Sequence, residues 1–278
     1  MTLSSPAELI ELKGADAEKF AQAQFCNDVS GLAPGASQLS AWLNPQGRVR
    51  RMFHLLRAGE DRYLLLLRGG AAAPIVAPLR LFVLRLKVQV TALEGWRWHE
   101  LAPDEAATGA GESWALPLPG GTRRLLLQSP EAIAEGRISA RETAARDIDA
   151  GLPWLPEHAL EQVLPSWMEF ARLDAISHAK GCYPGQEIVA RLHFRGGGDK
   201  RVPAVVVGNA TADAGGLLRD TAGAEAGLLL QSVPRGDGGW RALAVLKREN
   251  AAPGCALAAE NGQACQVAEA PWQRAAEQ

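Results

Sequence analysis

Residues 180–191 read Lys-Gly-Cys-Tyr-Pro-Gly-Gln-Glu-Ile-Val-Ala-Arg and carry the most unusual local chemistry of this chain. Cys182 stands between two glycines, and Lys180 precedes it by two residues. The Pro-Gly pair that follows forms a tight turn that can open a helix over about residues 186–193. A thiol beside a lysine and a helix N-terminus tends toward the thiolate. The segment therefore predicts a reactive cysteine; the alternative is an ordinary turn around a buried one.

Basic residues gather in this segment and in a second one nearer the N-terminus. Residues 180–201 contain five Lys or Arg against two acids, and residues 48–57 contain four Arg and no acid. The two segments predict a shared groove for an anionic ligand, such as a polyglutamate tail, a phosphate or RNA. The alternative is two solvated faces. Only Tyr183 and Phe194 are interleaved with the first set of cations, so nucleic acid is the less favoured ligand.

The cysteine segment resembles the signature of the YgfZ family. The matching residues are Lys-Gly-Cys-Tyr-x-Gly-Gln-Glu at 180–187, Val-Ala-Arg at 189–191, Phe-Arg-Gly at 194–196 and Lys-Arg at 200–201. Members of this family are folate-binding-type proteins linked to iron–sulfur cluster assembly or repair and to tRNA modification. Their fold is similar to that of the glycine cleavage T protein, an aminomethyltransferase. Weaker similarities extend the resemblance over residues about 9–201, and they lie at 14–20, 27–29, 44–48 and 148–153.

The resemblance implies an α+β fold, the glycine-cleavage-T-protein-like folate-binding fold with two α+β lobes and a small C-terminal β-barrel. The body is expected to span residues 1–195. One lobe would combine residues about 1–45 with 145–195, and the other would cover about 46–144. Short β runs between glycines independently predict a barrel over residues 196–278. A run of three glycines at the start of that region is the expected boundary.

Local patterns place the expected helices and strands. Helices are predicted at 17–25, with Asp16 as N-cap, at 73–83 and at 130–140. The clearest strand signals before the barrel lie at 38–43, 49–56, 63–67, 86–91 and 125–128.

The resemblance also implies which residues do the chemistry. Cys182 would be the working thiol, contacting sulfur or iron transiently or responding to redox, and Lys180 would bias it toward thiolate. Four further residues would shape or anchor the loop: Tyr183, Gln186, Glu187 and Arg191. A second set would bind tetrahydrofolate or another folate derivative: Asn44, Arg48, Glu169, Arg195, Lys200 and Arg201.

Two departures from the family pattern bear on the folate site. Residues 165–169 read Pro-Ser-Trp-Met-Glu where the family usually carries Pro-Gln-x-x-Asn, so Ser166 and Glu169 replace two amides. Ala7 and Thr143 stand where some members have tryptophans that stack on folate. A pterin would then have to be held around Trp42, Trp154 or Trp167.

Composition and missing motifs exclude several classes of protein. The 29 Lys and Arg against 31 Asp and Glu give a net charge of −2, which argues against a dedicated nucleic-acid coat. Neither a secretory signal nor a membrane span is evident, so a cytoplasmic protein is expected. The four cysteines form no Cys-x-x-Cys pair, so free thiols and no stable metal site are expected. Nucleophile-elbow, P-loop and Rossmann motifs are absent.

The favoured hypothesis is a YgfZ-like folate-binding accessory protein, rather than an enzyme. It would support iron–sulfur cluster assembly or repair and thereby tRNA modification. Its partners would be folate and either iron–sulfur client enzymes or assembly proteins. The chain is expected to be a monomer and not to associate with membranes. Two alternatives stay open. One is a tetrahydrofolate-dependent aminomethyl or one-carbon transferase, and the other is an RNA-binding accessory protein that uses the two Arg-rich segments.

Overall fold

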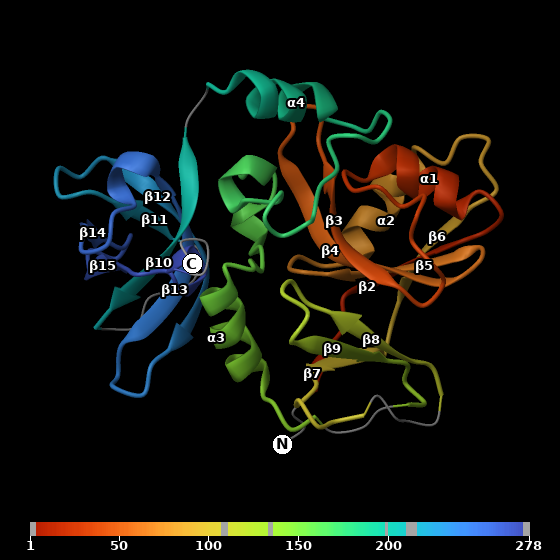
Figure 1. Ribbon diagram of the computed structural model, residues 1–278, viewed down its shortest axis with the longest axis horizontal. Helices are drawn as coiled ribbons and strands as arrows, with labels where there is room; N and C mark the ends of the chain where they lie inside the picture. The colour runs from red at the N-terminus through yellow and green to blue at the C-terminus, as the bar shows by residue number, and fades with distance from the viewer. Residues whose placement is uncertain (1–3, 107–110, 133–135, 198–199, 210–215, 275–278) are drawn as a thin grey trace.

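Three antiparallel sheets and a few short helices form the predicted α+β fold (Figure 1). The computed structural model describes residues 4–106, 111–132, 136–197, 200–209 and 216–274. Within these residues no helix has the length and apolar character needed to cross a membrane.

The five-stranded sheet forms the centre of the body. Its strands run in the order β3 (Ser37–Leu43), β4 (Val49–Gly59), β5 (Arg62–Leu67), β2 (Leu9–Lys13) and β6 (Gln89–Leu93). Successive side chains of a strand point to opposite faces. In β4, Phe53 and Leu55 therefore pack under helices α1 (Ala17–Gln24) and α2 (Ala73–Arg80), while Met52 and Leu56 face the rest of the body.

The four-stranded sheet packs against that second face. Its order is β1 (Ser5–Pro6), β7 (Arg97–Glu100), β9 (Arg124–Gln128) and β8 (Ser113–Pro117). The helix predicted at 130–140 is wrong, because residues 130–132 and 136–139 are not helical. The helix is α3 (Ala140–Ala150), whose N-terminus is fixed by a capping box between Ser139 and Glu142.

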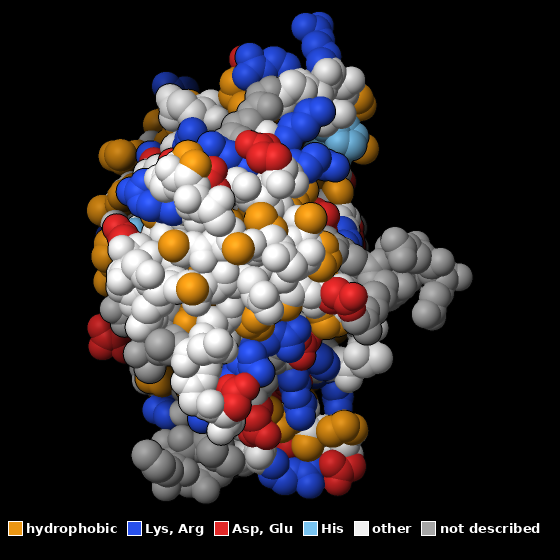
Figure 2. Space-filling model, turned by 90° about the vertical axis from the view of Figure 1, so that its left-hand side faces the viewer, with side chains coloured by type: hydrophobic (Ala, Val, Ile, Leu, Met, Phe, Trp, Pro, Cys, Tyr) orange, Lys and Arg blue, Asp and Glu red, His pale blue; other side chains and the backbone are white. Residues whose placement is uncertain are grey.

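The predicted C-terminal barrel is confirmed as a closed barrel of six strands, and Figure 2 views the molecule from this side. Its order is β10 (Arg201–Gly208), β13 (Trp240–Lys247), β12 (Glu225–Pro234), β11 (Leu217–Arg219), β14 (Ala256–Ala258) and β15 (Ala264–Ala268). Closure comes from pairing of β10 with β15. Val205 and Leu243 of the barrel pack on Ile148 of α3, which joins the barrel to the body.

A long connection runs between the barrel and the five-stranded sheet (Figure 1). It includes the 3₁₀ turns η1 (Glu157–Ala159) and η2 (Pro165–Met168) and ends in helix α4 (Gln186–Arg195), which lies at one end of the molecule. The last short elements are η3 (Arg248–Asn250) and α5 (Pro271–Arg274). The expected division of the body into two lobes stays a prediction. Its expected boundary near residue 45 falls between β3 and β4, which are paired strands of one sheet.

Candidate functional site

The thiol loop, residues 177–185, is held to the end of helix α1 by Lys180. The side chain is 7% exposed, and its Nζ donates to the backbone carbonyl oxygens of Gln22 at 2.7 Å, Asn27 at 3.0 Å and Phe25. The last carbonyls of a helix lack partners within the helix and lie at its negative end, so an ammonium group suits this position. Burial lowers the pKa of Lys180 to about 8.

The thiol whose pKa is affected by this ammonium group is that of Cys26. Its Sγ lies 3.3 Å from the carbonyl oxygen of Ala175, to which it donates. Burial raises the Cys26 pKa to about 11, and the charge of Lys180 opposes that rise only in part. Cys182, by contrast, is the one exposed cysteine of the four. Lys180 thus turns toward the interior while Cys182 turns toward solvent, and an effect of Lys180 on the Cys182 thiol stays a prediction.

Tyr183 gives the thiol loop a second buried anchor. It is 7% exposed, and the Lys180 ammonium lies 5.3 Å from the centre of its ring, a cation–π contact. Burial raises the pKa of its hydroxyl. With a buried residue on either side, Cys182 is presented to solvent on a backbone that is fixed at two points.

The turn at residues 44–48 packs directly against the start of α4. The Asn44 Oδ1 accepts a hydrogen bond from the backbone N–H of Arg48 at 2.9 Å, and its Nδ2 donates to Glu161 at 3.0 Å. A Cβ atom on Gly185 would lie 2.5 Å from the Asn44 carbonyl oxygen and 2.8 Å from the Gly47 Cα. Only glycine permits this approach. The structure therefore joins two segments that the sequence resemblance treats separately.

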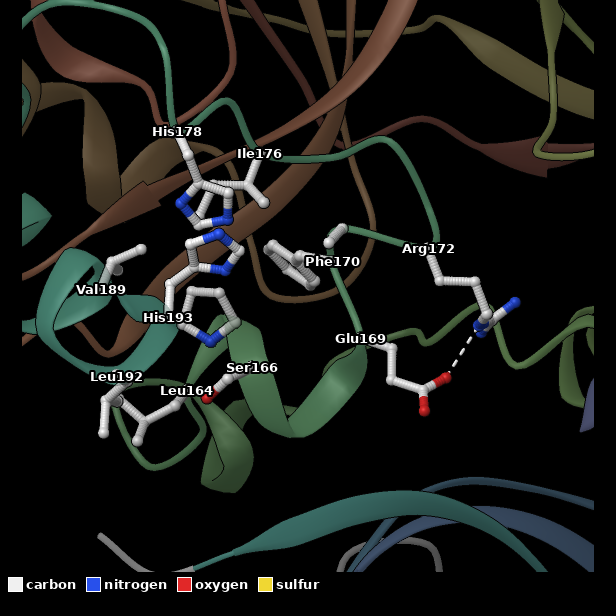
Figure 3. Close-up of a pocket in the computed structure, with 12 residues that line it drawn as sticks. Leu164, Ser166, Glu169, Phe170, Arg172, Ile176, His178, Val189, Leu192 and His193 are labelled. Carbon is white, nitrogen blue, oxygen red and sulfur yellow. Dashed lines mark hydrogen bonds and ion pairs between the residues drawn. The ribbon is translucent and has the colours of Figure 1, made fainter. Parts of the chain in front are cut away.

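A pocket of about 500 Å³ lies between α4 and the segment that leads into the thiol loop (Figure 3). It is lined by Leu164, Pro165, Ser166, Glu169, Phe170, Ala171, Arg172, Ile176, His178, Val189, Leu192 and His193. Glu169 pairs with Arg172 at 2.8 Å on one side. The rings of His178 and His193 stack on the other, with centroids 3.7 Å apart. Burial and the neighbouring His193 lower the pKa of His178.

A second cleft, of about 590 Å³, separates the body from the barrel. Trp167 lines it, and two guanidinium groups lie near its ring, with the Arg48 carbon 5.8 Å and the Arg201 carbon 4.6 Å from the ring centre. Arg201 also pairs with Glu225 at 2.9 Å. Because Glu225 and Glu260 both line the cleft, its charges nearly balance. Two predicted folate contacts, Arg48 and Arg201, therefore lie in this second cleft, whereas Glu169 lines the pocket under α4.

The three tryptophans proposed as pterin platforms lie outside the pocket under α4. Trp42 of β3 is 2% exposed and packs on the sheet face that the helices α1 and α2 cover. Trp154 stacks on Trp98 with ring centres 5.1 Å apart. Trp167 belongs to the second cleft. Among the described residues that line the pocket, the aromatic side chains are Phe170 and the two stacked histidines.

The remaining predicted residues follow helix α4 and the linker beyond it. Gln186 is half-buried in the first turn of the helix, and the others are exposed: Glu187, Arg191, Arg195 and Lys200. Sequence reasoning missed Phe170 and Arg172 as pocket residues. His178 and His193 could be found in the sequence only as residues on either side of the thiol segment, because their contact depends on how the chain folds back.

The described residues contain no group of three or more His, Cys, Asp or Glu side chains placed to hold a metal ion.

Comparison with known proteins gives matches in sequence and in structure. The GCVT N-terminal domain matches residues 4–100. An uncharacterized protein of Haemophilus influenzae is 29% identical over 197 residues, covering 68% of this chain and 67% of that protein. The tRNA-modifying protein YgfZ of Edwardsiella ictaluri is 28% identical, covering 67% of this chain and 65% of that protein. For YgfZ of Escherichia coli K12 the identity is 28%, and the match covers 76% and 72%.

The solved structure of glycine cleavage system aminomethyltransferase T from Bartonella henselae superimposes with a TM-score of 0.67 at 18% identity. The match covers 96% of this chain and 84% of that one, so it includes the barrel as well as the body. The predicted resemblance is thereby confirmed: this chain is a relative of the tRNA-modifying YgfZ proteins and has the fold of the glycine cleavage T protein.

Proposed function

We propose that this chain is a folate-binding accessory protein that supports the assembly or repair of iron–sulfur clusters and thereby tRNA modification. The observation that carries the proposal is the position of Cys182, the one exposed cysteine, on a loop whose neighbours Lys180 and Tyr183 are buried. The names of the YgfZ relatives support the link to tRNA modification.

The pocket under α4 suits a folate. Its walls are mostly apolar, as is usual for a pocket that holds a flat heterocycle. Glu169 offers a carboxylate to the adjacent N–H groups of a pterin ring, which can bond such a group in a bidentate way. The Phe170 ring and the stacked histidines offer flat surfaces against which a ring can lie. A folate bound there would supply one-carbon chemistry.

The thiol loop is continuous with this pocket. It contains His178 near its start and ends at α4, and His178, Leu192 and His193 all line the pocket. A ligand in the pocket would therefore contact the segments at both ends of the loop that carries Cys182. We propose that the Cys182 thiol loses its proton to solvent and that the resulting thiolate binds iron of a partner's cluster transiently, replacing another ligand of that iron.

The thiol role is tested by complementation in a strain that lacks its own copy of this protein. Cys182→Ser is expected to fold normally, because the side chain is exposed, yet to fail to restore the activity of iron–sulfur enzymes. The matched control is Cys255→Ser, at a partly exposed cysteine of the barrel, which should restore activity fully. Full rescue by Cys182→Ser would show that the thiol is not the working group.

The folate site is tested by calorimetric titration with tetrahydrofolate. Glu169→Gln keeps the size of the side chain but converts one acceptor oxygen into a donor, so binding should weaken by about tenfold or more. Glu225→Gln, in the second cleft, should bind as the unchanged protein does. Equal affinity for all three proteins contradicts a folate under α4. Turnover of an aminomethyl donor with tetrahydrofolate would favour the transferase instead.

A further inference from the structure

Helix α4 has an outward face that plays no part in the pocket. This face carries Arg191, Phe194 and Arg195, all of them exposed. Phe194 is 72% exposed, which is unusual for an aromatic side chain. The other exposed large apolar side chains in the described part of the chain are grouped at positions 81–84. Burial of Val189 shows which side of α4 packs against the body.

The two arginines of this face are not neutralised. Arg191 and Arg195 stand one helical turn apart, and neither forms an ion pair with any residue that the structure describes. Like charges at this spacing weaken a helix. The negative end of the helix favours Arg195, but Arg191 lies too far inside the helix to benefit. Lys200, just beyond the helix, adds a further exposed cation.

An aromatic cluster adjoins these cations. The Phe194 ring lies 4.7 Å from His193 at an angle of 80°, and His193 stacks in turn on His178. The exposed phenyl ring is thus supported on one edge, which limits its rotamers and prepares its free face for stacking. Aromatic rings that alternate with Arg or Lys are typical of surfaces that bind single-stranded nucleic acids.

The other basic segment of the sequence does not form such a surface. Arg50 pairs with Glu161 at 3.3 Å, Arg57 pairs with Glu18 at 3.1 Å, and Arg51 is 8% exposed. These cations serve the fold. Figure 2 shows Lys and Arg side chains gathered at the end of the molecule where α4 lies, with a histidine among them.

We infer that the outward face of α4, made of Arg191, Phe194 and Arg195, binds single-stranded RNA. A base stacks on Phe194, and the arginines contact the phosphates on either side of it. This surface is separate from the pocket on the inward side of the helix. RNA binding by this face can therefore be measured in the absence of folate.

The test is fluorescence anisotropy with a labelled single-stranded RNA of about 12 nucleotides, and with the duplex of the same sequence as comparison. The single strand is expected to bind more tightly than the duplex. Phe194→Ala should weaken single-strand binding by about tenfold, and Phe194→Trp should preserve it. The double variant Arg191→Ala/Arg195→Ala should lower the slope of log Kd against log salt by about 1.4, since each lost phosphate contact contributes about 0.7.

Matched controls come from the exposed segment after α2. Leu81→Ala and Arg85→Ala remove side chains of similar kind from exposed positions, and they should leave RNA binding unchanged. The inference is overturned if the RNA does not bind at about 50 mM salt. It is also overturned if the duplex binds as tightly as the single strand, or if Phe194→Ala behaves like Leu81→Ala. In those cases the α4 face is a docking site for an acidic protein or has no partner.

Discussion

At the scale of single residues, two cysteines of this chain have opposite surroundings. Cys26 is buried beside the Lys180 ammonium and donates to a carbonyl oxygen, whereas Cys182 is exposed. The sequence indicates Cys182 as the special thiol but gives no sign that Lys180 lies beside Cys26. Lys180 bonds the carbonyl oxygens on either side of Cys26, those of Phe25 and Asn27, which are 155 and 153 positions away, so no local pattern can report this approach.

The Cys26 environment predicts a specific loss of stability in alkali. Because the folded-state pKa is raised to about 11 from the ordinary 9.0, folding favours the neutral thiol. This contribution is complete below pH 9 and is lost as the pH rises toward 11, at a cost of roughly 2–3 kcal/mol. Cys26→Ala should therefore lose less stability between pH 9 and 11 than the unchanged protein does.

Urea unfolding at a series of pH values measures this difference. Cys265, whose pKa burial also raises to about 11, is present in both proteins, so its contribution cancels in the comparison. Parallel curves for the two proteins would mean that the pKa of Cys26 is the same in the folded and the unfolded state.

At the scale of elements, the junction between α4 and the turn at residues 44–48 depends on Gly185. Its φ of +79° belongs to the left-handed region, and a Cβ would meet the Asn44 carbonyl oxygen at 2.5 Å. Gly185→Ala should cost about 2–4 kcal/mol in the free energy of unfolding, from backbone strain and overpacking together. Gly181→Ala, in the same loop with open space around it, should change stability by less than about 0.5 kcal/mol.

Urea denaturation of the two glycine variants is the measurement. Equal midpoints would show that the turn can move away from α4 without cost. A loss in Gly185→Ala accompanied by faster alkylation of Cys26 would show that the whole region opens.

The helices differ in how well their sequence predicts them. The Pro-Gly turn sets the start of α4 correctly at Gln186, because turn chemistry is local. The helix expected at 130–140 begins instead at Ala140, where the Ser139–Glu142 capping box offered the better signal. The helix expected at 73–83 ends at Arg80 and gives way to an exposed apolar segment. Hydrophobic periodicity could not locate that end, since the apolar pattern continues beyond it.

At the scale of the whole molecule, a buried ionic network joins the sheets to α3. Arg68, fully buried at the end of β5, donates to Asp147 of α3 at 2.7 Å, and Arg123 of the β8–β9 turn contacts the other oxygen of Asp147 at 2.8 Å. Arg123 also pairs with Glu100 of β7 at 2.7 Å. A charge inside a protein is tolerated only when it is paired and hydrogen-bonded. The network therefore fixes the relative positions of these elements.

Removal of Arg68 should be costly for this reason. Arg68→Met leaves the Asp147 carboxylate buried with fewer partners, so the free energy of unfolding should fall by about 3 kcal/mol or more. Arg137→Met removes an exposed arginine that pairs with Asp104, and its unfolding midpoint should not change measurably. Urea unfolding followed by tryptophan fluorescence compares them. Similar midpoints for both variants would refute a structural role for the network.

The overall architecture could be predicted further than the site. Glycine-spaced β runs indicated the barrel, and the signature around Cys182 indicated the T-protein-like body, because both are marked by local residue patterns. The pocket under α4, the second cleft and the Arg68 network are products of contacts between distant segments. Glu169 and Arg201, which the sequence assigns to one ligand, lie in different cavities for this reason.

The bond between Lys180 and the end of α1 also has a consequence for the order of events during synthesis. The ammonium group and the Phe25 carbonyl are 155 positions apart, so at ordinary translation rates they emerge roughly ten to thirty seconds apart. Until Lys180 arrives, water must occupy the last carbonyls of α1. The contact that anchors the thiol loop therefore cannot form until both the end of α1 and residue 180 are present, so a fixed backbone around Cys182 requires both parts of the body.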